Sequence, residues 1–174
     1  MTPNGGGAWN NISDGLPDRH VTRVTVDPED ALTCYVTLSG YRNVDYQPHV
    51  MKTTDGGQTW LDISGDLPEV PANDIIIDPD NEDVLYLATD LGVWVSFNEG
   101  LNWEILGLDL PIVAVPDLRF HQPTRTLLAG TYGRSFYTID LNQLVNTESL
   151  AENISVKIFP NPAIDHINLS LIHI

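Results

Sequence analysis

Six residues of the chain combine aromatic rings with charge in a way that suits ligand binding. A guanidinium beside exposed tyrosines can stack on a sugar ring or hold a carboxylate through two parallel hydrogen bonds. The alternative is a set of solvated loops in which each arginine pairs with a neighbouring acid. The six candidate ligand-binding residues are Tyr41, Arg42, Tyr46, Asp90, Tyr132 and Arg134.

No catalytic residue can be assigned from the sequence. Glycoside hydrolysis requires two carboxyl groups about 5 to 10 Å apart, and the chain has 24 Asp and Glu residues with nothing to show which two would meet. Acidic turns such as 78–83 lack the glycine and the distal Glu of a calcium loop. The five histidines lack metal-ligand spacing, and no phosphate-binding loop occurs. The sequence therefore predicts no metal and no cofactor.

Composition excludes two classes of partner. The net charge of −16 over 174 residues repels nucleic-acid phosphates and anionic lipid. No apolar run approaches the roughly 20 residues of a spanning helix. The first residues also lack the basic start and apolar stretch of a signal peptide, so we expect the chain to be a fragment whose native start lies upstream.

Three segments that end in tryptophan divide the chain into repeats. They are 2–9, 53–60 and 96–103, and their tryptophans Trp9, Trp60 and Trp103 lie 51 and 43 residues apart. A Leu-Pro pair follows each tryptophan, and the Val26-Asp-Pro sequence recurs as Ile77-Asp-Pro. Several landmarks in one phase indicate a repeat architecture.

Each repeat is expected to fold into short β-strands. In the second repeat, hydrophobic and β-branched residues predict strands near 74–77, 84–89, 93–97 and 103–106. A four-stranded antiparallel sheet that recurs every 40 to 50 residues is typical of propeller blades. We predict an all-β fold, an incomplete β-propeller of about three four-stranded antiparallel blades. Trp94 could offer a platform for a sugar, but its place within a predicted strand favours packing between blades.

The tryptophan segments resemble the Asp-box repeats of sialidase-like propellers, whose pattern is Ser/Thr-x-Asp-x-Gly-x-Thr-Trp. Segment 53–60 matches every defined position, whereas segments 2–9 and 96–103 have Asn for Asp. We call 53–60 and 96–103 the box turns. The resemblance implies that they join the third and fourth strands of a blade on the face opposite the ligand. The residues that it assigns to structure are Thr53, Asp55, Gly57, Thr59, Trp60, Ser96, Asn98, Gly100 and Trp103.

The last repeat, 116–140, offers only three strands and no box turn. Its sequence Thr126-Leu-Leu-Ala-Gly-Thr-Tyr-Gly-Arg-Ser-Phe-Tyr-Thr-Ile-Asp140 resembles the closing blade of propellers related to xyloglucanases, photosystem assembly factors and sortilin-type receptors. The resemblance implies that the missing outer strand comes from the protein's true N-terminus, which would remove the open sheet edge.

The candidate ligand residues follow from aligning the repeats. The segment between Gly40 and Val50 is eight residues longer than its counterpart in the second repeat. It joins the second and third strands of its blade, so in propeller topology it shares a face with the connector to the next blade. Asp90 in the second repeat, and Tyr132 with Arg134 in the third, occupy the corresponding place.

The C-terminal part changes in composition. Residues 141–152 are polar and acidic and are expected to form a linker. Residues 153–174 resemble the start of the type A sorting domain of type IX secretion, a strand followed by an aromatic-Pro-Asn-Pro-Ala turn and an alternating strand. The residues that match this sorting motif are Phe159, Pro160, Asn161, Pro162, Ala163 and Asp165.

Two functions remain open from the sequence. The first is a module of 1–140 that binds a glycan or an extracellular protein, exported by the type IX machinery and secreted or held on the outer surface of a Gram-negative cell. The second is the C-terminal part of a xyloglucanase-like glycoside hydrolase, so the sequence leaves open whether the protein is an enzyme.

Overall fold

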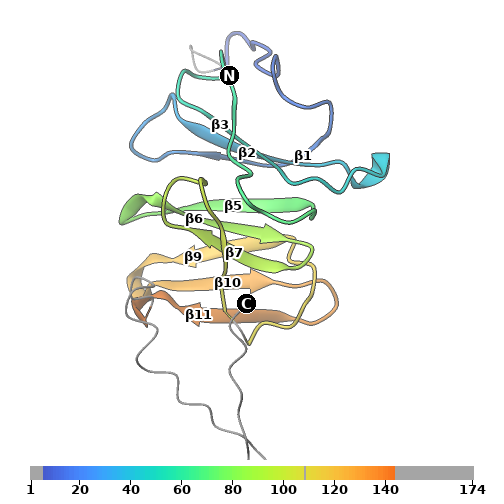
Figure 1. Cartoon of the computed structure of the whole chain (residues 1–174). Coiled ribbons are helices and arrows are strands. Elements are labelled where there is room, and N and C mark those ends of the chain that lie inside the picture. The colour runs from blue at the N-terminus through green and yellow to red at the C-terminus, as the bar shows by residue number, and fades with distance from the viewer. Residues whose placement is uncertain (1–5, 108, 144–174) are drawn as a thin grey trace, which may run out of the picture. The chain divides into compact units, whose positions relative to one another are not determined.

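The computed structural model describes residues 6–107 and 109–143 of the chain. These residues form three antiparallel β-sheets joined in chain order (Figure 1). The first sheet contains β1 (His20–Val26), β2 (Cys34–Ser39), β3 (His49–Thr53) and β4 (Leu61–Asp62). The second contains β5 (Ala72–Asp78), β6 (Asn81–Thr89), β7 (Gly92–Ser96) and β8 (Glu104–Ile105). The third contains β9 (Asp117–His121), β10 (Thr126–Gly130) and β11 (Phe136–Asp140).

The prediction of an all-β fold in three repeated units is confirmed. The four strands expected in the second repeat correspond to β5 through β8, with ends that differ by a few residues. The described helices are short 3-10 turns, η1 (Tyr41–Asn43), η2 (Gln122–Thr124) and η3 (Leu141–Gln143). The third sheet has the order β11-β10-β9, so its three strands also agree with the prediction.

The second sheet is buried on both faces because it lies between the other two. The last six residues of β6 are all buried, a pattern that period-two alternation alone would not give. On one face, Ile75 and Leu87 pack with Tyr35 and Val50 of the first sheet. On the other face, the Tyr86 ring lies 6.2 Å from the Phe120 ring of the third sheet.

One buried carboxylate joins all three sheets. Asp74 of β5 is 1% exposed and accepts a hydrogen bond from the Arg23 guanidinium of β1, with 2.7 Å between Nη2 and Oδ2. The backbone N–H of Leu118 in β9 donates to the same oxygen at 2.8 Å. Arg23 also reaches Asp117, and Arg119 pairs with Asp117 at 2.9 Å. The first strands of the three sheets are therefore tied side by side through charge.

A second ion-pair network joins the second and third sheets. The Arg125 guanidinium donates to both oxygens of buried Asp78, at 3.0 and 2.7 Å, and also pairs with Asp80. Tyr86 donates its hydroxyl to Asp78 at 2.7 Å. Burial opposes ionisation of Asp78, but the hydrogen bonds from Arg125, the Asp80 N–H and Tyr86 outweigh it and hold the pKa of Asp78 below its usual range.

The third sheet extends slightly beyond β11. Leu141 is buried, and its N–H donates to the Arg125 carbonyl at 2.8 Å, so the compact unit reaches this residue. Most of the expected linker, and the whole sorting motif from Phe159 to Asp165, lie outside the described residues. In the described part of the chain, no helix is both long and apolar enough to cross a membrane.

We expect Asp74→Ala to lower the free energy of unfolding by about 3 kcal/mol, because it leaves the Arg23 guanidinium and the Leu118 N–H without their buried acceptor. Denaturant unfolding followed by tryptophan fluorescence measures the loss. Asp117→Ala is the matched control, since this acid faces the same arginines but is 46% exposed and its loss should stay under about 1 kcal/mol. Equal losses for the two variants would contradict the role of Asp74.

Candidate functional site

The candidate ligand residues lie in the loops that join the second and third strands of each sheet. These loops, 40–48, 90–91 and 131–135, occupy the same end of their sheets as the connectors 63–71 and 106–116, and we call this the loop end. The Asp90 N–H donates to the Pro71 carbonyl at 3.3 Å, and the Tyr132 N–H donates to the Ala114 carbonyl at 2.8 Å. In Figure 1, η1 and the turn between β10 and β11 lie on the same side.

Tyr41 and Tyr46 form an exposed aromatic pair in loop 40–48. Their ring centroids are 5.9 Å apart with an interplanar angle of 74°, an edge-to-face contact. Tyr41 is 62% exposed and Tyr46 is 47% exposed. The turn of η1 brings Tyr41 back toward Tyr46, because the N–H groups of Asn43 and Asp45 both donate to the Gly40 carbonyl.

Asp45 fixes the shape of loop 40–48. Its Oδ2 accepts from Arg19 Nε at 2.7 Å and pairs with His49 Nε2 at 3.0 Å, while Oδ1 accepts from the Gln47 N–H at 3.0 Å. The hydrogen bonds from His49, Arg19 and Gln47 hold the pKa of Asp45 well below its usual range. A Cβ at Gly40 would come within 2.7 Å of the Asp45 Cβ, so the turn requires glycine. Sequence reasoning did not assign Asp45 this role, although a short acid two residues before a turn amide is a signal for it.

The two candidate arginines are free of the ion pairs that hold the others. Arg19, Arg23, Arg119 and Arg125 are all paired with aspartates. Arg42 and Arg134 are exposed and have no ion pair or side-chain hydrogen bond within residues 6–107 and 109–143. Both lie at the loop end. The alternative in which these arginines pair with neighbouring acids therefore does not describe this structure.

Asp90 and Tyr132 are placed differently from the tyrosine pair. Asp90 Oδ1 accepts a hydrogen bond from Asn73 Nδ2 at 2.9 Å, and the same amide donates to the Val115 carbonyl at 3.2 Å. Asp90 therefore belongs to a set of hydrogen bonds that joins β5 to the segment between β8 and β9. Tyr132 is 81% exposed in a tight turn that is closed by a bond from the Thr131 N–H to the Ser135 carbonyl.

The structure joins only part of the predicted set. Tyr41 and Tyr46 contact each other, and Arg42 lies between them in sequence on η1. Among the described residues, no ring contact, ion pair or hydrogen bond links this group to Asp90, Tyr132 or Arg134. The six residues share the loop end but form three separate groups along it.

The first box turn is a closed hydrogen-bonded unit. Asp55 accepts from the hydroxyls of Thr53 and Thr59 and from the N–H groups of Gln58 and Thr59, at 2.7 to 2.9 Å. The hydroxyl and amide of Thr59, followed by Thr53, lower the pKa of Asp55 to about 2. Gly57 has φ +87°, and a Cβ there would lie 2.7 Å from Ile12.

The second box turn repeats this pattern with weaker groups. Ser96 donates to Asn98 Oδ1 at 3.0 Å, and the Gly100 N–H donates to Ser96 Oγ at 2.8 Å. Asn98 Oδ1 also accepts the Asn102 N–H at 2.9 Å. All of these polar groups are occupied within their own turn, so the box turns stabilise hairpins.

The box-turn tryptophans and Trp94 belong to the packing between sheets. Trp60 donates from Nε1 to the Ile12 carbonyl at 2.9 Å, and Trp103 donates to the Ile63 carbonyl at 3.1 Å. Trp94 packs against the core cluster that contains Trp103. Trp94 thus packs in the fold, as the favoured interpretation of the sequence predicts, and does not offer an open platform.

We expect Asp55→Asn to reduce stability at neutral pH, because a neutral amide accepts the turn amides more weakly than a carboxylate. The folded-state pKa of about 2 lies below the ordinary value of 3.8, so the advantage of the wild type is complete above pH 3.8 and declines as the pH falls toward 2. Thermal melts of both proteins between pH 7 and pH 2 test this. A difference in Tm that stays constant across that range would refute it.

Comparison with known proteins identifies the fold. No protein-family model matches the chain, and no curated protein is similar to it in sequence. The chain is similar in structure to a GH74 enzyme from Niastella koreensis, with 20% identity, a TM-score of 0.55, and coverage of 69% of this chain and 21% of that one. A GH74 xyloglucanase from Xanthomonas campestris gives 18% identity, a TM-score of 0.52 and coverage of 69% and 22%.

An ancestral GH74 enzyme gives 18% identity and a TM-score of 0.51, with coverage of 66% of this chain and 17% of that one. The chain therefore spans about a fifth of the length of these structures. At such identities the likeness concerns the fold alone. The fold is an incomplete β-propeller, and the three sheets are its blades.

Proposed function

We propose that the protein is a secreted or cell-surface β-propeller module that binds a glycan or an extracellular protein at the loop end. The observation that carries the proposal is that Arg42 and Arg134 are exposed without described partners, at the same end as the Tyr41–Tyr46 pair. Every other arginine of this strongly acidic chain is held by an aspartate.

The chemistry of loop 40–48 suits a sugar ligand. Two exposed tyrosine rings in edge-to-face contact offer apolar surface to the C–H face of a sugar, and their hydroxyls can bond its hydroxyl groups. The Arg42 guanidinium adds five donors for hydroxyl or carboxylate oxygens. Because Asp45 and η1 fix the loop before any ligand arrives, less conformational entropy is lost on binding.

Within the described residues, the acids with a displaced pKa have it lowered, and these are Asp30, Asp45, Asp55, Asp78 and Glu99. A glycosidase requires one carboxylic acid whose pKa is raised so that it can protonate the leaving group.

Export by the type IX machinery rests on the sequence from Phe159 to Asp165 and is part of the proposal.

The binding proposal is tested by glycan-array screening followed by titration calorimetry on each glycan retained. We expect Tyr41→Ala with Tyr46→Ala, and separately Arg42→Gln, to weaken binding about tenfold, or about 1.4 kcal/mol. Arg119→Gln is the control, since it removes an exposed guanidinium from β9 rather than from the loop end. If the tyrosine variant retains full affinity, the ligand does not bind at loop 40–48. Retention of a protein but no glycan would assign the loop end to protein binding.

A second candidate function is the C-terminal part of a xyloglucanase-like glycoside hydrolase. The sequence 126–140, which resembles the closing blade of xyloglucanase-related propellers, is the observation that favours this candidate. Release of reducing sugar from xyloglucan and from unbranched β-glucan, measured with the chain and with any longer polypeptide that contains it, tests the idea. We expect no release by the 174-residue chain, and the absence of turnover by both proteins would end the enzyme hypothesis.

A further inference from the structure

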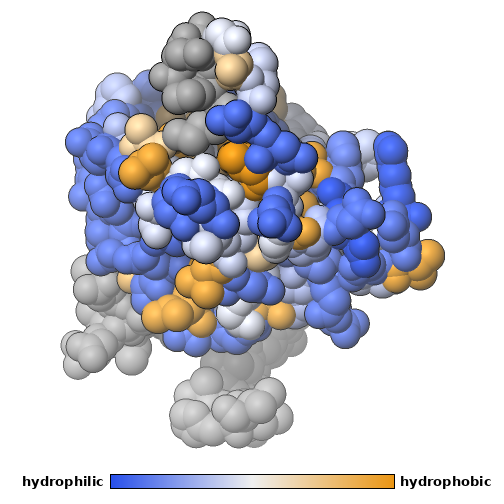
Figure 2. Space-filling model, turned by 90° about the horizontal axis from the view of Figure 1, so that it is seen from above, coloured by the Kyte–Doolittle hydropathy of each residue, from blue (hydrophilic) through white to orange (hydrophobic). Residues whose placement is uncertain are grey.

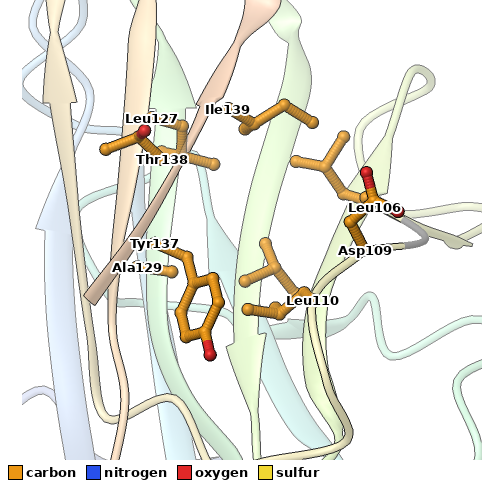
Figure 3. A pocket seen from close by; sticks show the side chains of 10 residues that line it. Leu106, Asp109, Leu110, Leu127, Ala129, Tyr137, Thr138 and Ile139 are labelled. Carbon is orange, nitrogen blue, oxygen red and sulfur yellow. The ribbon is translucent and has the colours of Figure 1, made fainter. Parts of the chain in front are cut away.

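An apolar pocket lies between the second and third blades. Its volume is about 140 Å³, and its lining includes Val93, Leu106, Asp109, Leu110 and Ile139. Figure 3 shows Leu106, Asp109 and Leu110, from the segment after β8, across the pocket from Tyr137 and Ile139 of β11. We call it the open pocket.

Between the first and second blades, the corresponding place is filled by Trp103. Its side chain is 4% exposed and belongs to a cluster with Val50, Ile63 and Leu67. Trp103 donates from Nε1 to the Ile63 carbonyl at 3.1 Å and from its backbone N–H to Asp66 Oδ1 at 2.7 Å. One tryptophan at the start of β8 therefore fills an apolar site and satisfies two acceptors on the preceding blade.

The open pocket is built from the same residues one repeat later. Trp60 and Trp103 are 43 residues apart. Adding 43 to the number of each residue around Trp103 gives a residue that lines the open pocket. The pairs are Val50 with Val93, Ile63 with Leu106, Asp66 with Asp109, and Leu67 with Leu110. What the pocket lacks is the tryptophan, because the third blade has no fourth strand among residues 6–107 and 109–143.

The chain also carries a fourth-strand segment that belongs to no described sheet. Residues 9–16 repeat the sequence after Trp60 with a shift of 51, so that Ile12 corresponds to Ile63 and Leu16 to Leu67. Trp60 donates to the Ile12 carbonyl and belongs to the same cluster as Leu16. In the same way, Trp103 donates to the Ile63 carbonyl and belongs to the same cluster as Leu67. Trp9, at the position of Trp60 and Trp103, is 79% exposed.

We propose that the third blade is completed by residues 9–16 of a second copy of this chain. In that arrangement Trp9 enters the open pocket, where it donates from Nε1 to the Leu106 carbonyl and from its backbone N–H to Asp109. The segment pairs with β11, the outermost described strand of the third blade. The third blade of one copy then packs against the first blade of the other copy. This contact has the same arrangement as the contact between the first and second blades within one chain.

The exchange also determines the stoichiometry. The contact is head-to-tail, and such contacts form a ring when the rotation closes. Two copies of the 174-residue chain contribute three described blades each, and six blades lie within the range of four to eight found in propellers. Figure 2 looks onto the first blade and shows apolar residues there among polar ones. Closure would also cover Val24 of β1, which is 55% exposed. Its neighbour Thr25 faces the second blade and donates to the Ile75 carbonyl, so Val24 faces the opposite side, where the second copy would pack.

The proposal is tested by sedimentation equilibrium of the 174-residue chain in about 0.15 M salt, where surface charge repulsion is screened beyond roughly 8 Å. We expect a discrete dimer whose dissociation constant rises roughly 30-fold or more in Trp9→Ala, as for a buried aromatic anchor. Because Trp9 is exposed in the single copy, this variant should still fold. Leu101→Ala, which removes a side chain that is 71% exposed on the second box turn, is the control and should leave the dimer intact.

Hydrogen exchange provides a second measurement. The amides of β11 should be protected in the wild-type dimer and lose protection in Trp9→Ala, because the edge strand then has no partner. A monomer at all concentrations, a dimer that Trp9→Ala leaves unchanged, or an open-ended series of oligomers would overturn the proposal. A chain that stays monomeric but binds a peptide of residues 6–17 would show that another segment, and not a second copy, completes the blade.

Discussion

The packing of the three blades depends on the need to satisfy the buried carboxylate of Asp74. A carboxyl group that is 1% exposed is tolerated only with charged or hydrogen-bonding partners close by. Asp74 takes Arg23 from the blade before it and the Leu118 N–H from the blade after it. Hydrogen bonds are directional, whereas apolar contacts between sheets are not. Asp74 therefore determines how the first strands of the three blades lie against each other.

The hydrophobic contacts between blades follow a repeated arrangement built on tryptophan. Trp60 and Trp103 each reach back to the carbonyl of an isoleucine in the connecting segment that precedes their own blade. Bonding to the backbone keeps the indole in place whatever side chains surround it. The same arrangement continues to Leu106 and Leu110, where the tryptophan is missing. The open pocket therefore has the composition of a contact between blades and differs in kind from the proposed ligand site at the loop end.

The two ends of the blades use their polar residues differently. In the box turns the side-chain oxygens are consumed within the turn, and the low pKa of Asp55 reflects this. At the loop end, Asp45 is consumed in the same way, but it thereby holds Tyr41 and Tyr46 in an exposed position. One end thus uses its polar side chains within its own turns, and the other uses similar bonds to present exposed aromatic and cationic groups.

The sequence by itself determined the all-β class, the three repeated units, the strands of the second repeat and the three strands of 116–140. These properties follow from local alternation, turn residues and the spacing of tryptophans, which do not depend on distant contacts. Only the tertiary structure decided which charges are paired, because Arg23 and Asp74 are 51 residues apart and Arg125 and Asp78 are 47 apart. It likewise separated Arg42 and Arg134 from the paired arginines, and showed that the six candidates form three groups, since distance between loops is set by how sheets stack and not by the order of residues.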